Sequence, residues 1–385
     1  MTGQKTISTT LKIDGDNKIT LRAASNARHL EIVSGGNLTL AQITLADSNI
    51  TTAVCGGAIK VGAGGWLTTN RVQLINNRTA GNGGALCVDA SGGAELNYTL
   101  IKGNTSSGNG GGVYNQGLVD VMWSDVSVNQ AQLNGGGLWN NNSLGINLSL
   151  VSNNRLPTGT LVRGSQEGGG IYNIGSTSVS ASTISGNIAS YAAGIYNQNA
   201  DLWLTGVTLA SNSASAAIGG LESKGTGSSQ VRNTIIANNL PDNCGTGYTK
   251  TVISNGNNLD SLNQCNFNAT ADQRNTNPLL QPLNYNGGIT RTMALLPGSP
   301  AIDAADNTYC AFYDQRGFSG PDSGGIASRN VDGNNDGQVV CDLGAFEFHP
   351  DIFKDGLTSG QGGNILQHGL PSIPKPGGLD GGTFQ

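Results

Sequence analysis

The chain has 385 residues and a formal net charge of −5, with 20 basic and 25 acidic side chains. Charged residues make up only 12% of the chain, about half the usual share in globular proteins, whereas glycine alone accounts for 59 residues. So few basic residues form no stripe that could follow a phosphate backbone, and no apolar run approaches the about 20 residues of a membrane helix. We therefore expect neither nucleic acid binding nor a membrane span.

Two sequence markers recur through residues 1–240 with a period of about 26 residues, the sign of a repeat architecture. The first marker is a Gly-Gly-(Ala/Gly)-aliphatic motif, and the second is an asparagine three positions after an aliphatic residue. The aliphatic residues of the first marker are Ile59, Leu86, Val113, Leu138, Ile171, Ile195 and Leu221. The asparagines of the second are Asn77, Asn104, Asn129, Asn154, Asn187, Asn212 and Asn239, with Asn49 as a candidate earlier member.

Between the markers are alternating stretches of three to five residues, such as Ala58–Val61 and Val72–Leu74, bounded by Gly, Asn, Ser or Thr. These stretches predict short strands and turns, and none has the spacing of a helix. Three short strands and three turns use about 25 residues and advance the chain by one strand spacing of about 4.8 Å. The sequence therefore predicts an all-β fold, a right-handed parallel β-helix (a pectin-lyase-like solenoid) with about 8–10 coils.

A polar residue that returns once per coil stacks on its equivalents, and amide side chains can then pass hydrogen bonds along the axis. We interpret the asparagines of the second marker, from Asn77 to Asn239, as such a structural ladder. Another set with the same period is expected to form a second ladder. It consists of Asn115, Asn140, Asn173 and Asn197.

Aromatic residues directly follow the aliphatic residue of the first marker in four successive coils. They are Tyr114, Trp139, Tyr172 and Tyr196. Because neighbouring strand residues alternate between faces, these rings are expected to point outward in an exposed row. Such a row suits sugar rings or a protein partner, and the alternative is ring stacking that stabilises the sheet.

The interval between Asn154 and Asn187 is longer than the others and carries about eight extra residues near 155–167. Insertions in a solenoid usually leave it as surface loops, so this segment is a candidate protrusion, with a loop of no particular role as the alternative.

Beyond Asn239 the period ends, and a different region extends over residues 241–348. Its motifs are Leu295–Asp303 (LLPGSPAID), Asp314–Gly317 (DQRG) and Cys341–Glu347 (CDLGAFE). This region resembles the C-terminal part of the choice-of-anchor Q domain of secreted and surface-attached bacterial β-helix proteins. The preceding repeats resemble those of that family and of the polymorphic outer-membrane proteins.

The resemblance covers about residues 5–348 and implies an exported β-helix that is presented outside the cell, without implying a catalytic mechanism. Residues 241–348 are then expected to complete or cap the helix. Residues 349–385 form a Gly/Pro-rich tail whose composition predicts flexibility unless another surface holds it.

The six cysteines include no CxxC motif and no Cys/His cluster, so disulfides in an oxidising compartment are a better explanation than zinc. Six cysteines allow fifteen pairings. Proximity in the sequence favours Cys244–Cys265 and Cys310–Cys341, which leaves Cys55–Cys87 by elimination.

Asp332, Asn334 and Asp336 stand at positions 1, 3 and 5 of a stretch that matches the start of a calcium loop, with a glycine at position 6. The twelfth position is Leu343 in place of an acid, so only half of the motif is present. These three residues are candidate ligands of a structural Ca²⁺, and a tight Asn/Asp/Gly turn is the alternative. No other cofactor is expected.

Polysaccharide lyases and hydrolases need clustered carboxylates, but the few acids of the repeats differ in phase, and no histidine lies between residues 30 and 348. We therefore expect a non-enzymatic extracellular or cell-surface protein, either an adhesin or a structural subunit of a filament, sheath or matrix. The alternatives are a polysaccharide-active β-helix enzyme and a glycan-binding module that uses the aromatic row. Expected partners are another copy of the chain, by head-to-tail or tail-mediated assembly, or a surface or matrix polysaccharide.

Overall fold

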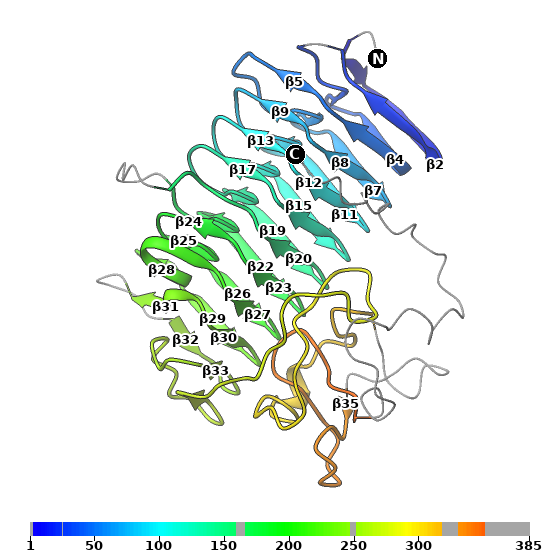
Figure 1. Ribbon diagram of the computed structural model, residues 1–385. Coiled ribbons are helices and arrows are strands. Elements are labelled where there is room, and N and C mark those ends of the chain that lie inside the picture. Colours follow the sequence, from blue (N-terminus) through cyan, green and yellow to red (C-terminus); the bar gives the residue numbers. More distant parts are fainter. Residues whose placement is uncertain (1–2, 25, 159–165, 247–251, 318–329, 351–385) are drawn as a thin grey trace, which may run out of the picture.

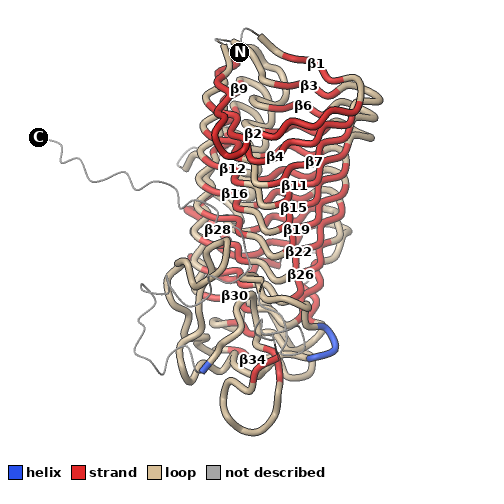
Figure 2. The backbone as a smooth tube through the Cα atoms, turned by 90° about the vertical axis from the view of Figure 1, so that its right-hand side faces the viewer, coloured by secondary structure: helices blue, strands red, loops and turns tan. Residues whose placement is uncertain are grey.

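The computed structural model describes residues 3–24, 26–158, 166–246, 252–317 and 330–350 (Figure 1). Within them the chain winds as a parallel β-solenoid of about nine turns, which repeat about every 26 residues. Figure 2 shows the strands as successive rungs of one column, with a loop-rich region at one end. The structure confirms the fold class that the repeat predicts. No helix in the described part of the chain has the length and hydropathy needed to cross a membrane.

The first sheet has 11 strands and contains the residues that follow each Gly-Gly motif. Equivalent residues of successive turns pair in parallel, so that Leu86 pairs with Ile59 on one side and with Val113 on the other. The strands are β1 (Lys5–Ile7), β3 (Leu30–Ile32), β6 (Ile59–Val61), β10 (Leu86–Val88), β14 (Val113–Asn115), β18 (Leu138–Asn140), β21 (Ile171–Asn173), β24 (Ile188–Ala189), β25 (Ile195–Gln198), β28 (Ser213–Lys224) and β31 (Leu240–Thr246).

The second sheet has 19 strands, because most turns contribute two strands that meet at a corner. The corner residue has a positive φ, as at Tyr98 (51°) and Trp123 (47°). Before the corner lie β7 (Trp66–Asn70), β11 (Gly93–Asn97), β15 (Leu118–Met122), β19 (Ser143–Asn147), β22 (Ser176–Ser180), β26 (Leu202–Thr205), β29 (Ser229–Arg232) and β32 (Val252–Ser254). After the corner lie β8 (Gln73–Ile75), β12 (Leu100–Lys102), β16 (Asp125–Ser127), β20 (Leu150–Ser152), β23 (Thr183–Ser185), β27 (Thr208–Ala210), β30 (Ile235–Ala237), β33 (Leu259–Asp260) and β34 (Gln273–Arg274). The long strands β2 (Thr10–Arg22) and β4 (Asn37–Ala46) span both positions.

The remaining elements are short. A 4-stranded sheet closes several of the turns and consists of β5 (Asn49–Ile50), β9 (Arg78–Thr79), β13 (Thr105–Ser106) and β17 (Gln130–Ala131). An antiparallel 2-stranded sheet joins β35 (Asn330–Val331) and β36 (Val340–Cys341), and η1 (Asn307–Tyr309) is a short 3-10 helix.

The interior of the solenoid is a column of aliphatic side chains. Ile59, Leu86 and Val113 are equivalent residues of three successive turns, and each has 0% of its surface exposed. Aliphatic residues of the second sheet belong to the same apolar cluster. Because each turn buries its apolar side chains against the turns on both sides, stability arises mainly from the interfaces between neighbouring turns.

The Gly-Gly motif forms a tight corner before the strands of the first sheet. Gly110 has a positive φ of 65°, a conformation that residues with a side chain rarely adopt. At Gly111 a Cβ atom would lie 2.2 Å from the carbonyl oxygen of Gly136 in the next turn. Glycine is therefore required at this corner for successive turns to approach each other.

Stacking continues past residue 240 and ends at β34, so residues 5–274 are called the array below. Residues 277–317 and 330–349, called the C-terminal block, then pack on the outer face of the second sheet (Figure 1). The amide of Ala345 donates to Thr208 Oγ1 at 3.0 Å, and Arg291 Nη2 donates to Ser152 Oγ at 3.2 Å. A second apolar cluster fills this contact and includes Ile235, Leu259, Leu295, Ile302, Leu343 and Phe346.

Three disulfides close the described structure, and they are the pairs that sequence proximity and elimination favour. They join Cys55 to Cys87, Cys244 to Cys265 and Cys310 to Cys341. Residues 159–165 of the expected protrusion and residues 351–385 of the expected tail lie outside the described residues.

Candidate functional site

Seven asparagines of the second marker lie in one buried, hydrogen-bonded row along the axis. The backbone N–H and the Nδ2 of Asn104 both donate to Oδ1 of Asn129, at 3.0 and 2.9 Å, and Nδ2 also donates to the carbonyl of Leu74 at 2.9 Å. The same contacts recur in the other turns, and all seven side chains are 0% exposed. Asn49 is not a member, because Ser48 donates its backbone N–H to Asn77 at that level and Asn49 is exposed.

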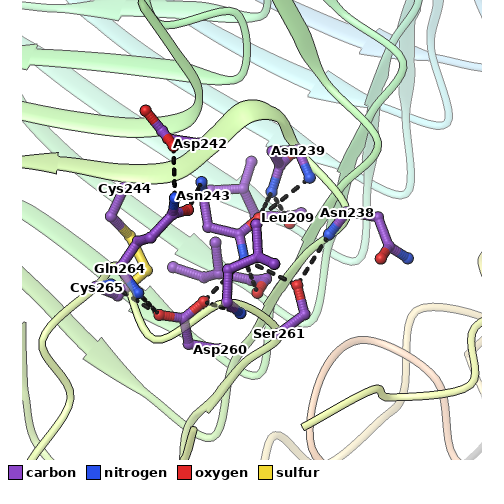
Figure 3. Close-up of a disulfide and its surroundings, with 12 residues drawn as sticks. Leu209, Asn238, Asn239, Asp242, Asn243, Cys244, Asp260, Ser261, Gln264 and Cys265 are labelled. Atoms are coloured by element: carbon purple, nitrogen blue, oxygen red, sulfur yellow. Dashed lines mark hydrogen bonds between the residues drawn. A yellow bond between two sulfur atoms is a disulfide. The ribbon is translucent and has the colours of Figure 1, made fainter. Parts of the chain in front are cut away.

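The row ends on a carboxylate beside the Cys244–Cys265 disulfide (Figure 3). Asn239 Nδ2 donates to Asn243 Oδ1 at 3.0 Å, and Asn243 Nδ2 donates to Asp260 Oδ1 at 2.8 Å. The other oxygen of Asp260 accepts from the amide of Cys265 at 2.7 Å. The period gave no signal for these last two members, because Asn243 follows Asn239 by only four residues.

Two further rows run parallel to the first. Asn115 Nδ2 donates to Asn140 Oδ1 at 2.7 Å, and the row continues through Asn173 and Asn197, so the structure brings the second predicted set together. The third row was not predicted, although its members recur at the same intervals. This row lies at the corner of the second sheet, where the backbone N–H of each member donates to the side-chain hydroxyl of the equivalent residue in the next turn. Its members are Thr99, Ser124, Ser149 and Ser182.

The four predicted aromatic rings stack face to face, but they are not an exposed row. Ring centroids are 4.3 Å apart for Tyr114 and Trp139, 6.4 Å for Trp139 and Tyr172, and 5.2 Å for Tyr172 and Tyr196. Trp139, Tyr172 and Tyr196 are only 8, 8 and 3% exposed, which corrects the expectation of an open platform. The rings lie in a cluster with Ala192, which stands at the repeated corner in the place that Gly168 takes one turn earlier.

A group of ionisable side chains lies at the end of this row. Burial raises the pKa of Glu167, an effect that Lys224 opposes and Glu222 strengthens. Burial and the nearby Glu167 raise the pKa of Tyr172 to about 12, and the same causes raise that of Tyr196 further. Both hydroxyls therefore keep their protons at neutral pH.

The remaining contacts leave this group little room for a substrate. Lys224 pairs with Glu222 at 2.9 Å and lies 5.2 Å from the ring centroid of Tyr196. Glu167 and Glu222 are each 7% exposed. Acids with altered pKa values are common in active sites, but catalysis also requires an accessible reacting group. The arrangement fits a covered ionic cluster.

The candidate calcium residues lie in a turn whose oxygens accept backbone hydrogen bonds. Asp332 Oδ1 accepts from the amide of Asp336 at 3.0 Å, and Asn334 Oδ1 accepts from the same amide at 2.8 Å. Asp303, from another segment, accepts from the amides of Gly333 and Asn334. Among the described residues, no group of three or more His, Cys, Asp or Glu side chains could hold a metal ion. A structural Ca²⁺ therefore stays a prediction.

The motifs of the C-terminal block converge on a buried network of charged groups. Arg316 Nε pairs with Asp314 at 2.7 Å, and Arg316 Nη2 donates to the carbonyl of Glu347 at 2.6 Å. Oε2 of Glu347 accepts from the amide of Asp342 at 3.0 Å, and Asp342 Oδ1 accepts from the amide of Asp303 at 2.8 Å. These carboxylates join backbone segments that are distant in the sequence, which is a structural role for the DQRG and CDLGAFE motifs.

The described surface also has one feature that the sequence did not indicate. A shallow cleft of about 260 Å³ lies between the outer face of β26 and β29 and the helix η1. Trp203 and Tyr309 stand in it and are 39 and 49% exposed. Because these residues are 106 positions apart and belong to different regions, no period could relate them.

Residues 98–116 match the model of the Chlamydia polymorphic membrane protein repeat. The matched segment contains β12, β13 and the first residues of the next turn, with the ladder residue Asn104 and the corner residue Gly111 inside it. It thus contains one copy of each of the two sequence markers. No match was found among curated proteins or among solved structures.

Proposed function

We propose that this chain is a non-enzymatic scaffold at the cell surface or outside the cell, with a structural or adhesive role. The observation that carries the proposal is that the recurring polar side chains of the array are engaged in hydrogen bonds between turns. The amides of the asparagine rows and the hydroxyls of the third row all face their equivalents in the next turn, so they build the column and leave few groups for chemistry.

Three features support export. The matched repeat comes from a family described as membrane proteins, and three disulfides are typical of an oxidising compartment. The resemblance of residues 241–348 to the choice-of-anchor Q domain supports the same location. Labelling of intact producing cells with a membrane-impermeant amine reagent tests it, since exposed lysines such as Lys12 and Lys18 should react. Labelling that occurs only after cell lysis would contradict a surface location, whereas a secreted protein would be recovered from the medium.

A polysaccharide-active enzyme is the second candidate, and the Glu167, Glu222 and Lys224 group is the observation in its favour. The purified chain would be incubated with polygalacturonate and other acidic polysaccharides, and unsaturated products and reducing ends would be measured. We expect neither. Product formation that disappears in the Glu167→Gln variant would replace the scaffold proposal by this one.

Self-assembly is part of the scaffold proposal. The first turn exposes apolar side chains of β2, with Leu11 40% and Ile19 46% accessible, whereas the C-terminal block packs beside the last turns. An apolar strand edge is a site where another chain can add. Light scattering of the full chain should therefore detect oligomers that a Leu11→Lys, Ile19→Lys double variant does not form. A purely monomeric full chain would remove assembly from the proposal.

A further inference from the structure

The cleft between the array and the C-terminal block combines two exposed rings with hydrogen-bonding groups. Trp203 extends from the outer face of β26, and Tyr309 ends η1 on the other side. Exposed tryptophan and tyrosine rings offer flat apolar faces with polar edges, which suit the face of a ring-shaped ligand. The volume of about 260 Å³ is below the range of about 300–1,000 Å³ for drug-sized ligands. The cleft therefore suits one ring of a longer molecule.

Arg232 places a positive charge on the wall of this cleft. Its guanidinium carbon lies 3.5 Å from the ring centroid of Tyr309, so the planar group stacks on the ring and keeps its N–H edge available. Among the described residues its side chain has no ion pair and no hydrogen-bond partner, and no Asp or Glu lines the cleft. A stacked guanidinium without a partner is prepared for a bidentate contact with a carboxylate.

Two amide side chains complete the cleft. Asn255 Nδ2 donates to Gln230 Oε1 at 3.2 Å. This contact orients both groups and leaves Nε2 of Gln230 and Oδ1 of Asn255 for a ligand. One is a donor and the other an acceptor, which is what a sugar hydroxyl can use at once.

We infer that this cleft binds a carboxylate-bearing sugar residue of an acidic polysaccharide. The ring faces of the sugar contact Trp203, its carboxylate pairs with Arg232, and its hydroxyls bond to Gln230 and Asn255. The inference rests on the proposed function, because it gives the adhesive scaffold a ligand class. It differs from binding by the stacked row at Trp139, which is buried.

Titration calorimetry of the full chain tests the inference with three acidic probes, namely oligomers of galacturonate, alginate and hyaluronan. At least one should bind, and its methyl-esterified form should bind about tenfold more weakly or not at all, because the charge partner of Arg232 is lost. Arg232→Gln should reduce the affinity for the acid form to that for the ester. Trp203→Ala should weaken both forms by about tenfold or more.

Controls separate the site from the fold. Phe312→Ala removes another exposed ring, 70% accessible and outside the cleft lining, and should leave binding unchanged. Thermal unfolding of Trp203→Ala and Arg232→Gln should match that of the parent chain. Failure of all three acidic probes, equal binding of acid and ester, or equally tight binding of poly-glutamate would overturn the inference. The cell-labelling and polysaccharide-turnover assays described above test the proposed function and do not depend on these binding results. The two proposals can therefore fail separately.

Discussion

The array and the C-terminal block satisfy their buried backbone groups with different chemistry. In the array the side chains that do so are mostly neutral amides and hydroxyls, as along the row from Asn77 to Asn239. In the C-terminal block they are mostly carboxylates, such as Asp342 and Glu347, whose surfaces are 0% exposed. The array repeats the same hydrogen-bond arrangement in each turn, whereas each hydrogen-bond arrangement in the C-terminal block occurs only once.

The reason lies in what each group can donate. An amide accepts through Oδ1 and donates through Nδ2, so each rung can receive a hydrogen bond from one turn and give one to the next. A carboxylate only accepts, and carboxylates stacked at about 4.8 Å would repel each other. An acid can therefore end a row but cannot continue it, as Asp260 ends the row after Asn243. Asp272 has the same position after Asn258. It accepts from the backbone N–H of Asn258, and Oδ1 of Asn258 accepts from the backbone N–H of Thr234.

The largest expected effect separates the two regions. Arg316→Ala removes the cation that pairs with the buried carboxylate of Asp314, and breaking a buried ion pair in this way typically costs about 3–5 kcal/mol. Because this pair belongs to the block, hydrogen exchange should become faster in residues 277–317 and 330–349 and stay slow in the asparagine rows. The exposed Arg78→Ala is the matched control. Equal acceleration in both regions would mean that the block and the array unfold as one unit.

A change inside the array tests the donor argument. Asn129→Asp replaces the Nδ2 that donates to Ile101 and to Asn154 by an oxygen, which then faces two acceptors. We expect a loss of about 3 kcal/mol in the free energy of unfolding, larger than for Asn129→Ala, because an unpaired buried charge adds to the lost hydrogen bonds. Chemical denaturation measures it, and Asn141→Asp at an exposed position should have little effect. A smaller loss for Asp than for Ala would refute the argument.

The reverse exchange at the end of the row should cost less. Asp260→Asn keeps one acceptor for Asn243 but points an NH₂ group at the backbone amides of Gln264 and Cys265. The expected loss is about 1–3 kcal/mol, as for an unsatisfied buried donor. Thermal unfolding of the oxidised protein measures it, with Asp120→Asn at an exposed position of β15 as the control. An unchanged stability would show that this end of the row does not require a pure acceptor.

The smallest effect concerns an acid in the array. Because burial raises the pKa of Glu167, the folded chain binds this proton more tightly than the unfolded chain does. The resulting destabilisation is present above the raised pKa and decreases as the pH falls through it. Glu167→Gln should therefore raise the free energy of unfolding at pH 7, and the gain should shrink near pH 4. Denaturation at both pH values measures it, with Glu95→Gln on the outer face of β11 as the control. A gain that is the same at both pH values would point to packing rather than to charge.

The repeated part of the structure could be read from the sequence. Equivalent residues such as Asn104 and Asn129 have the same neighbours one turn away, so a period in the sequence becomes a row in space. The same reasoning covers the aliphatic column and the glycine corners, and it would have covered the hydroxyl row that begins at Thr99, because the interval to Ser124 is the same.

Only the tertiary structure decided which outward-facing side chains are covered. Alternation correctly places Trp139 and Trp203 on outer faces, yet one is 8% and the other 39% exposed. Trp139 is stacked between Tyr114 and Tyr172 of the adjacent turns, whereas the cleft at Trp203 needs Tyr309 from the C-terminal block. A repeat determines the contacts between adjacent turns, because translation reproduces them. It contains no information about where a non-repeating segment packs, and in this protein that packing creates the candidate site.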